Sequence, residues 1–378
     1  MRTGIATVPL DYGRCPRWLF ERMRRLSRGI VLAIVEEFGV EEILKRLSDP
    51  VWFQSLGCVI GFDYNSSGLT TTTLGALKEG LRGLESDLGI FICGGKKTSR
   101  KTPQEIQNWG EFLGWEEEKI NKTIYVSRMA AKIDSALIQD NFQIYAHNLV
   151  FTKSGQWSVI QQGMNTEIQR ARRYHWLSSR LGNLIEEPHS GIISDVRVKP
   201  LNLTARASSA NRKISAELVV EEPKTFLKDF RLILGKSNTL MKQRKLPSFV
   251  EMEFKNVEFY WHPVLKEKFD LKRLRKTIFA AHYLKPKNFE ELLATKGVGP
   301  KTIRALSLVS EIIYGARPSY EDPARYSFAV GGKDGTPFFV KKDVYDELLD
   351  VMERGIKRAK IENKEKIQAI ERLKTLNQ

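Results

Sequence analysis

Cysteine is scarce in this chain: among 378 residues there are only Cys15, Cys58 and Cys93, which stand far apart. Three isolated thiols cannot form a disulfide framework, a four-cysteine zinc site or the iron–sulfur loop found in some repair enzymes. This scarcity is typical of a protein kept in a reducing compartment, so we expect a cytoplasmic location.

Long apolar runs are also missing. The longest, residues 29–35, is far shorter than the stretch of about 20 apolar residues that crosses a membrane as a helix. The first residues, MRTGIATVPLDYG, lack the basic-then-apolar layout of a secretory signal. The sequence therefore predicts a soluble protein without a membrane segment.

Acidic residues are outnumbered by basic ones. Asp and Glu total 45 against 61 Lys and Arg, which gives a formal net charge of +16. Hydrophobic residues make up 42% of the chain, with 19 Phe, 11 Tyr and 7 Trp, so the composition is that of a folded protein rather than a disordered one. At roughly 150 residues per domain, the length predicts two or three domains. A folded protein with this surplus of positive charge is expected to bind a polyanion.

Residues 1–215 combine helical and extended patterns. Apolar side chains recur at helical spacing within 15–39, and two short apolar runs, 58–64 and 89–95, each precede a loop and a helix-like stretch. Such strand–loop–helix units favour partly parallel pairing. Further on, the turn KSGQ separates two extended runs, as in a hairpin. We predict an α/β domain built on a mixed sheet.

The remainder of the chain is expected to be mainly helical. We treat residues 216–262 as a connector, which contains a basic helical segment and a strand candidate at 249–260. Residues 263–378 are predicted to form an all-α domain that ends, from about residue 342, in a charged helix or helix pair with a solvated face.

The most specific local motif is KGVGPKT, which lies between two apolar helices within residues 289–315. It resembles the helix-hairpin-helix motif of DNA repair and recombination proteins. Two glycines permit a tight turn, and the N–H groups at the start of the second helix can bind a DNA phosphate without reading sequence. The alternative is an ordinary connection between helices with glycines at the bend. The residues expected to bind DNA here are Lys296, Gly297, Gly299, Lys301, Thr302 and Arg304.

DNA glycosylases of the helix-hairpin-helix class carry an essential aspartate after the hairpin, and some also keep a catalytic lysine. Asp322 lies 23 residues after Gly299, close to that separation, and Lys301 occupies the place of the lysine. The spacing is slightly long, however, and the residues around Asp322 do not follow the glycosylase pattern. Asp322-Pro323 also has the form of a helix cap followed by a first-turn proline.

A second basic region, GGKKTSRKTP, follows the apolar run at 89–95. It lacks the GxxxxGK[ST] spacing of a nucleotide-binding P-loop. The alternatives are a contact with a phosphate backbone and a merely solvated loop. The side chains in question are Lys96, Lys97, Arg100 and Lys101.

Carboxylates gather around the predicted hairpin, where they suggest a metal site. Carboxylates near a sheet suit Mg²⁺ or Mn²⁺, which activates water and neutralises developing charge during phosphodiester hydrolysis. We expect Asp63, Asp134 and Asp140 to bind the metal. We expect His147 to be a ligand or a proton-transfer group and Lys132 to stabilise the scissile phosphate. For Asp63, the competing interpretation is a cap on the following helix.

The hairpin departs in part from the known pattern of metal-dependent nucleases of the restriction-enzyme type. These carry an acidic residue and then, on a second strand, an acid or Gln followed one residue later by Lys; Asp140 and Gln161 match loosely, but position 163 is Gly. Strand alternation places Tyr145 and His147 on one face. A less specific polar cluster offers further candidate ligands from separate loops, namely Glu186, Glu187, His189 and Asp195, with His147 and His175.

Nearly the whole chain resembles an uncharacterised prokaryotic family, catalogued as a domain of unknown function and found in archaea and thermophilic bacteria. The resemblance rests on PRWLFERM, RLSDPVWFQSLGCVIGFDYNSSG, GGKKTSRKTP, IQQGMN, ARRYHW, EEPHSG and SFAVGGKDGTPFFV. It brings no established activity. It implies that the hairpin and the basic loops belong to one DNA-handling protein, and it implies a thermophilic source.

Three functions remain open at this point. The favoured one is a metal-dependent nuclease of DNA repair or recombination, with the metal site in the N-terminal domain and the DNA held by the C-terminal domain. The second is a non-enzymatic DNA- or RNA-binding module whose polar clusters are structural. The third is a glycosylase that uses Asp322 and Lys301. EDTA should abolish the activity of the nuclease, whereas it should leave a glycosylase active and a binding module unaffected.

Overall fold

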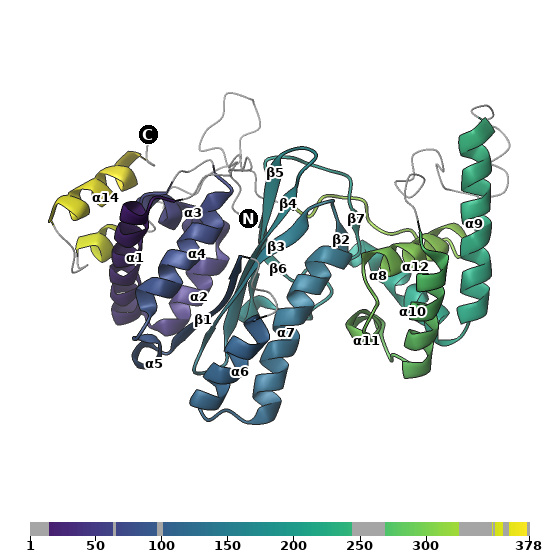
Figure 1. Ribbon diagram of the computed structural model, residues 1–378, viewed down its shortest axis with the longest axis horizontal. Helices are drawn as coiled ribbons and strands as arrows, with labels where there is room; N and C mark the ends of the chain where they lie inside the picture. Colours follow the sequence, from purple (N-terminus) through teal and green to yellow (C-terminus); the bar gives the residue numbers. More distant parts are fainter. Residues whose placement is uncertain are drawn as a thin grey trace.

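Figure 1 shows the fold, a computed structural model that describes residues 15–62, 66–96, 101–243, 269–324, 350, 352–357 and 363–375. A central sheet stands between two layers of helices, and a further group of helices lies at one end of the molecule. The expected mixture of sheet and helix, with helices toward the C-terminus, is confirmed.

The sheet is antiparallel throughout. Its five strands lie in the order β1 (Ile90–Lys96), β3 (Gln143–Thr152), β4 (Trp157–Asn165), β5 (Arg170–Leu177) and β6 (His189–Ile193). The predicted hairpin is formed by β3 and β4, in which Phe151 lies opposite Trp157. The predicted strand at 89–95 is β1, but it pairs antiparallel with β3. The expected parallel pairing is therefore wrong.

The reason lies in the predicted strand at 58–64, whose described residues, 58–62, do not form a strand. Cys58 and Val59 end the helix α3 (Pro50–Val59), which the Asp49 carboxylate caps by accepting the N–H of Val51 at 2.8 Å. Every residue of α3 except Val51 is buried. A helix buried on all sides has the same continuous apolar run as a buried strand, so periodicity does not distinguish the two.

Helices cover both faces of the sheet. On one side lie α1 (Arg17–Phe38), α2 (Val40–Ser48), α3, α4 (Gly68–Leu81) and the short α5 (Glu85–Leu88); on the other lie α6 (Thr102–Phe112) and α7 (Glu117–Ala136). Alternate residues of β3 face the two layers: Leu149 and Phe151 join the core with α7, whereas Val150 joins the core with α1–α4.

The C-terminal helices continue the same core. After a two-stranded sheet of β2 (Ile138–Gln139) and β7 (Leu201–Asn202), the chain forms α8 (Ser209–Val220), α9 (Pro223–Gln243), α10 (Leu271–Leu284), α11 (Phe289–Ala294) and α12 (Pro300–Ile312). Short 3₁₀ turns occupy Ser178–Arg180 and Arg206–Ser208. One apolar cluster runs from Phe151 on the sheet through Ile133 on α7 to Leu306 on α12. The strand candidate at 249–260 lies outside the described residues.

The end of the chain returns to the N-terminal helices. The last helix, α14 (Asn363–Thr375), lies beside α1 and α3 (Figure 1). Its Glu365 carboxylate is 3.5 Å from Arg22 Nε and 3.6 Å from Arg25 Nη1 of α1. No helix in the described part of the chain has the length and apolar character needed to cross a bilayer.

Candidate nucleic-acid interface

The glycine-rich motif forms a tight turn between α11 and α12. Gly297 has φ +93°, a left-handed conformation that favours glycine, and the buried Val298 anchors the turn in the core. The Val298 N–H donates to the carbonyl of Thr295 at 3.2 Å. The predicted sequence of helix, glycine turn and helix is therefore the local geometry of this segment.

The amide end of α12 opens onto a cleft of about 480 Å³. Gly299 is the N-cap residue and has no side chain to accept from the first N–H groups, and Pro300 occupies the first turn. Across the cleft lies the start of α10, where Asp270 accepts the N–H groups of Lys272 and Arg273 at 3.0 Å each. The partial positive charge of the α12 terminus thus faces a hollow large enough for a phosphate group.

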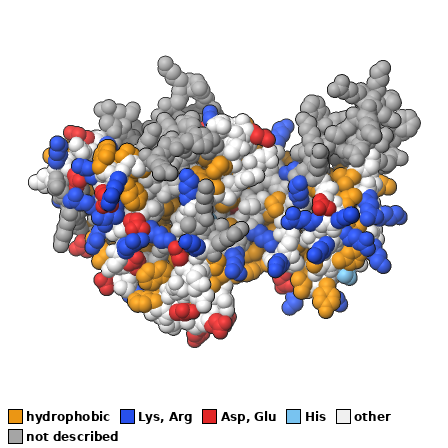
Figure 2. Space-filling model, viewed as in Figure 1, with side chains coloured by type: hydrophobic (Ala, Val, Ile, Leu, Met, Phe, Trp, Pro, Cys, Tyr) orange, Lys and Arg blue, Asp and Glu red, His pale blue; other side chains and the backbone are white. Residues whose placement is uncertain are grey.

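Basic side chains surround this cleft. Arg273 and Lys301 line it, and Lys296 is exposed on the adjoining turn. The outer side of α10 carries four exposed basic residues, and none of these four nor Lys296 forms an ion pair with any residue that the structure describes. The four are Lys272, Arg273, Arg275 and Lys276. Figure 2 shows Lys and Arg gathered over the C-terminal helices, with few acidic side chains between them.

These α10 residues are not among those predicted from the sequence to bind DNA. The string LKRLRK that carries them has the required signal, because four basic residues alternate with leucines at helical spacing. It lies some 20 residues before the hairpin, so only folding brings the two together at the same cleft.

Lys132, predicted to act on a scissile phosphate, instead holds the glycine turn. Its Nζ donates to the carbonyl of Thr295 at 3.0 Å, and burial lowers the pKa of this amine. Gln139 donates to the carbonyl of Pro300 at 2.9 Å and accepts from Arg304 Nε at 2.5 Å. These contacts fix the turn against α7 and β2, and they direct Arg304 inward rather than toward the cleft.

Asp134 and His147 belong to one buried network on the α7 side of the sheet. Asp134 accepts from Gln161, from the indole of Trp176 at 3.1 Å and from His189 Nε2 at 2.5 Å. Gln161 in turn accepts from His147 Nδ1 at 2.8 Å, so His147 Nε2 is left to accept from Ser127, also at 2.8 Å. The structure therefore brings Asp134, Gln161 and His147 together, but inside the core. Asp134 is 0% and His147 3% exposed.

Asp140 is engaged by a buried arginine. Its Oδ2 accepts from Arg172 Nη1 and from the Tyr174 hydroxyl, both at 2.8 Å, and its Oδ1 accepts from the Phe142 N–H at 3.0 Å. Arg172 also holds Asp322 at 2.8 Å. Burial disfavours the charge of this guanidinium, but the two carboxylates outweigh burial and raise its pKa. Arg172, Asp140 and Asp322 form an ionic triad that holds the segment after α12 against the sheet.

Tyr145 and His147 lie on opposite faces of the sheet, which corrects the prediction from strand alternation. A bulge between Ile144 and Ala146 inserts one unpaired residue into β3, and every side chain before it changes face relative to a regular strand. Tyr145 consequently contacts Gln162 on the α4 side, with its hydroxyl 2.5 Å from Gln162 Nε2.

The predicted basic loop is described only in part. Lys96 and Lys101 are exposed, and Lys96 Nζ lies 5.9 Å from the centre of the Tyr145 ring. Lys97, Arg100 and Asp63 lie outside the described residues. Within the described ranges, no group of three His, Cys, Asp or Glu side chains has the arrangement that could hold a metal ion. The Mg²⁺ or Mn²⁺ site stays a prediction that depends on Asp63.

Two buried histidines should make the protein sensitive to acid. Burial lowers the pKa of His147 from its usual 6.5, and it lowers the pKa of His175 well below that value. His175 donates through Nδ1 to the carbonyl of Leu47 and accepts the Arg173 Nε–H at 2.9 Å, so it is neutral in the fold.

Below pH 6.5, His147 and His175 therefore bind protons in the unfolded chain but stay neutral in the folded protein until the pH is lower. Stability is present above that pH and is lost as the pH falls toward the folded-state values. Between pH 7.5 and 5.5 we expect the free energy of unfolding to fall by about 1–3 kcal/mol, as measured by urea denaturation. A His147→Gln, His175→Gln double variant should show a flatter profile; an unchanged slope would contradict this assignment.

The described fold and cleft define an α/β protein with an antiparallel sheet, buried ionic networks and a basic helical end. The chain belongs to the family described as "Protein of unknown function (DUF763)", whose model matches residues 4–340. No match is found among the curated proteins or among the solved structures.

Proposed function

We propose that this protein binds DNA through the cleft between α10 and α12. The observation that carries the proposal is the amide end of α12, which has no side-chain cap, follows an exposed glycine turn and faces the start of α10, a helix with a row of exposed basic residues. This is the chemistry of a helix-hairpin-helix contact: backbone N–H groups and helix charge take one phosphate, and lysines and arginines take its neighbours.

Two further features support this proposal. The turn is held rigidly by Val298 in the core and by Lys132 from α7, so its N–H groups are preorganised. Residues 269–324 contain ten Lys and Arg against six Asp and Glu, and two of those acids, Glu311 and Asp322, are largely buried. The contacts offered are to phosphate, so binding should be salt-sensitive and tolerant of sequence.

Cleavage of the bound DNA is a separate question. The oxygens of Asp134 and Asp140 are occupied by Gln161, Trp176, His189, Arg172 and Tyr174, which argues for a structural role of these two carboxylates. Asp322, the residue a glycosylase would require, accepts from Arg172 and from the Val198 N–H at 2.9 Å. We therefore favour DNA binding as the proposed function over metal-dependent DNA cleavage and over glycosylase activity. Incubation of labelled DNA with Mg²⁺, Mn²⁺ or EDTA tests for a metal-dependent nuclease.

Gly299→Glu should weaken DNA binding about tenfold or more, because it places a carboxylate where the phosphate would sit. Position 299 is extended, with φ −142°, and a Cβ there meets no atom within 4 Å, so the fold should tolerate the change. Fluorescence anisotropy of labelled duplex, single-stranded and forked DNA at several salt concentrations measures the affinity.

Gly182→Glu is the matched control. Its Cβ also meets nothing within 4 Å, and it adds the same negative charge in a loop before β6. We expect this variant to bind like the wild type. Equal binding by Gly299→Glu, Gly182→Glu and the wild type, with all three folded, would refute the assigned interface.

A further inference from the structure

β1 is an edge strand: on its outer side, no other strand of the described chain pairs with it. The Lys153 N–H donates to the carbonyl of Gly89 at 3.2 Å, so in the alternation of an antiparallel ladder Phe91 and Cys93 direct their backbone groups toward β3. Ile90 and Ile92 must then direct theirs outward. The Thr152 N–H, opposite Ile90, agrees with this register because it donates to Gln156 across the hairpin.

Gly94 confirms the outward direction. Its N–H donates to Glu105 Oε2 at 2.7 Å and its carbonyl accepts from Lys78 Nζ at 3.2 Å. Lys78 and Glu105 also form an ion pair of 2.9 Å, which closes the edge at this end. For the outward groups of Ile90 and Ile92, the described residues supply no partner.

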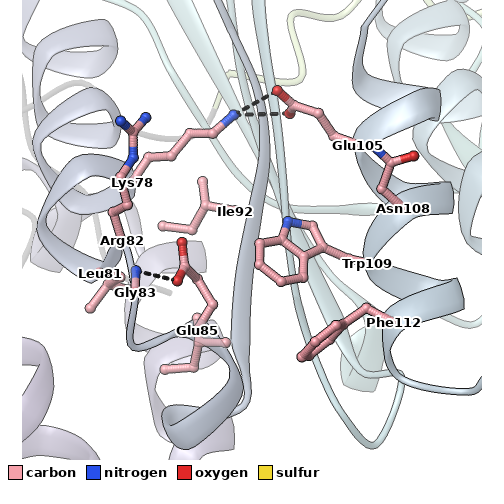
Figure 3. A pocket seen from close by; sticks show the side chains of 11 residues that line it. Lys78, Leu81, Arg82, Gly83, Glu85, Ile92, Glu105, Asn108, Trp109 and Phe112 are labelled. Atoms are coloured by element: carbon pink, nitrogen blue, oxygen red, sulfur yellow. Dashed lines mark hydrogen bonds and ion pairs between the residues drawn. The ribbon is translucent and has the colours of Figure 1, made fainter.

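These two residues form the floor of a groove of about 620 Å³. Figure 3 shows its walls: Lys78 and Leu81 come from α4 on one side, and Trp109 and Phe112 from α6 on the other. Ile90 is 0% exposed and Ile92 5%, whereas Phe112 is 63% exposed at the rim. The groove therefore combines recessed backbone donors and acceptors with apolar walls.

We infer that this groove binds a short extended peptide segment of a partner protein, which adds a sixth strand beside β1. Backbone groups at strand spacing specify an extended chain, and the walls specify large apolar side chains on it. Lys78 and Glu105 occupy the outward groups of Gly94 and so limit the paired length to residues 90–92.

A second copy of this chain does not suit the groove. Its own β1 is recessed between α4 and α6, so two such floors cannot approach within the roughly 4.8 Å that strand pairing requires. A single peptide without flanking helices meets no such obstacle. The proposal is independent of DNA binding, because the groove lies on the sheet and the cleft on the C-terminal helices.

A displayed library of random seven-residue peptides, selected on the full-length protein, tests the inference. Enriched peptides should alternate large apolar residues with others. Ile92→Pro removes the outward N–H without touching the ladder to β3, and should weaken a selected peptide about tenfold. Phe112→Asp, at the exposed rim, should weaken it as much or more.

Ile168→Asp is the matched control for the rim variant, because Ile168 is an exposed apolar residue, 41% accessible, in the turn between β4 and β5. It should leave peptide affinity unchanged. In hydrogen exchange, bound peptide should slow the amides of Ile90 and Ile92. Failure to enrich any peptide, equal binding to Phe112→Asp and Ile168→Asp, or a dimer of the wild type that Phe112→Asp dissociates would each overturn the proposal.

Discussion

Replacing Arg172 by methionine is expected to lower the free energy of unfolding by about 3–5 kcal/mol. The guanidinium is fully buried and lies 2.8 Å from each of two carboxylates, those of Asp140 and Asp322. Without it, both carboxylates would stay in the interior with no positive partner, and the segment after α12 would lose its tie to β5. Urea denaturation followed by tryptophan fluorescence measures the change.

Arg206→Met is the matched control. Its ion pair with Glu186 is 3.1 Å long, but the Arg206 side chain is 79% exposed and Glu186 keeps its ion pair with Arg212, so the loss should cost less than about 1 kcal/mol. Adding Asp140→Asn and Asp322→Asn to Arg172→Met should restore part of the lost stability, since the orphaned charges disappear. Similar losses for the two arginine variants would show that the triad has no special role.

Reversing three charges on α10, with Lys272→Glu, Arg273→Glu and Lys276→Glu, should weaken binding to duplex DNA about 100-fold or more at low salt. All three side chains are exposed, and none is paired with a described residue, so the change removes phosphate contacts without breaking internal ones. The slope of log affinity against log salt should also become shallower by about 2–3, because fewer counterions are released. Anisotropy titrations over a salt series give both quantities.

The control is a triple reversal of the same total charge elsewhere: Arg17→Glu, Lys45→Glu and Lys153→Glu, all exposed and all on the N-terminal half. It separates a local interface from attraction by the net charge of +16. If both triple variants lost affinity equally, binding would depend on overall charge, and the cleft between α10 and α12 would not be the site.

Local sequence patterns predicted the structure correctly where residues close in sequence determine it. The β3–β4 hairpin follows from two extended runs around KSGQ, and the turn before α12 follows from Gly297 and Gly299. The strand predicted at 58–64 was wrong for residues 58–62, because α3 is buried on nearly all sides and so lacks the helical periodicity of apolar residues. Tyr145 was misplaced because a bulge has no signature in sequence.

The chemical roles of polar residues were harder to predict than the fold. Asp134 and Asp140 have the residue type and the spacing of metal ligands, yet their partners Trp176, His189 and Arg172 come from strands 30 to 55 residues away. These partners come into contact with the two aspartates only because β5 and β6 pair beside β4 in a particular register. The sequence indicated polar residues that lie at the sheet, but it did not indicate that they form hydrogen bonds and ion pairs with one another.

The unbroken apolar cluster from Phe151 through Ile133 to Leu306 has a consequence for cooperativity. The α7-facing side of the sheet and the C-terminal helices share one core, so each covers apolar side chains of the other. A chain cut before α8 would lose Leu218, Leu306 and other members of the cluster to which Leu137 and Leu203 belong. We therefore expect the α7 side of the sheet and the C-terminal helices to unfold together, so that the basic cleft is lost when this shared core is lost.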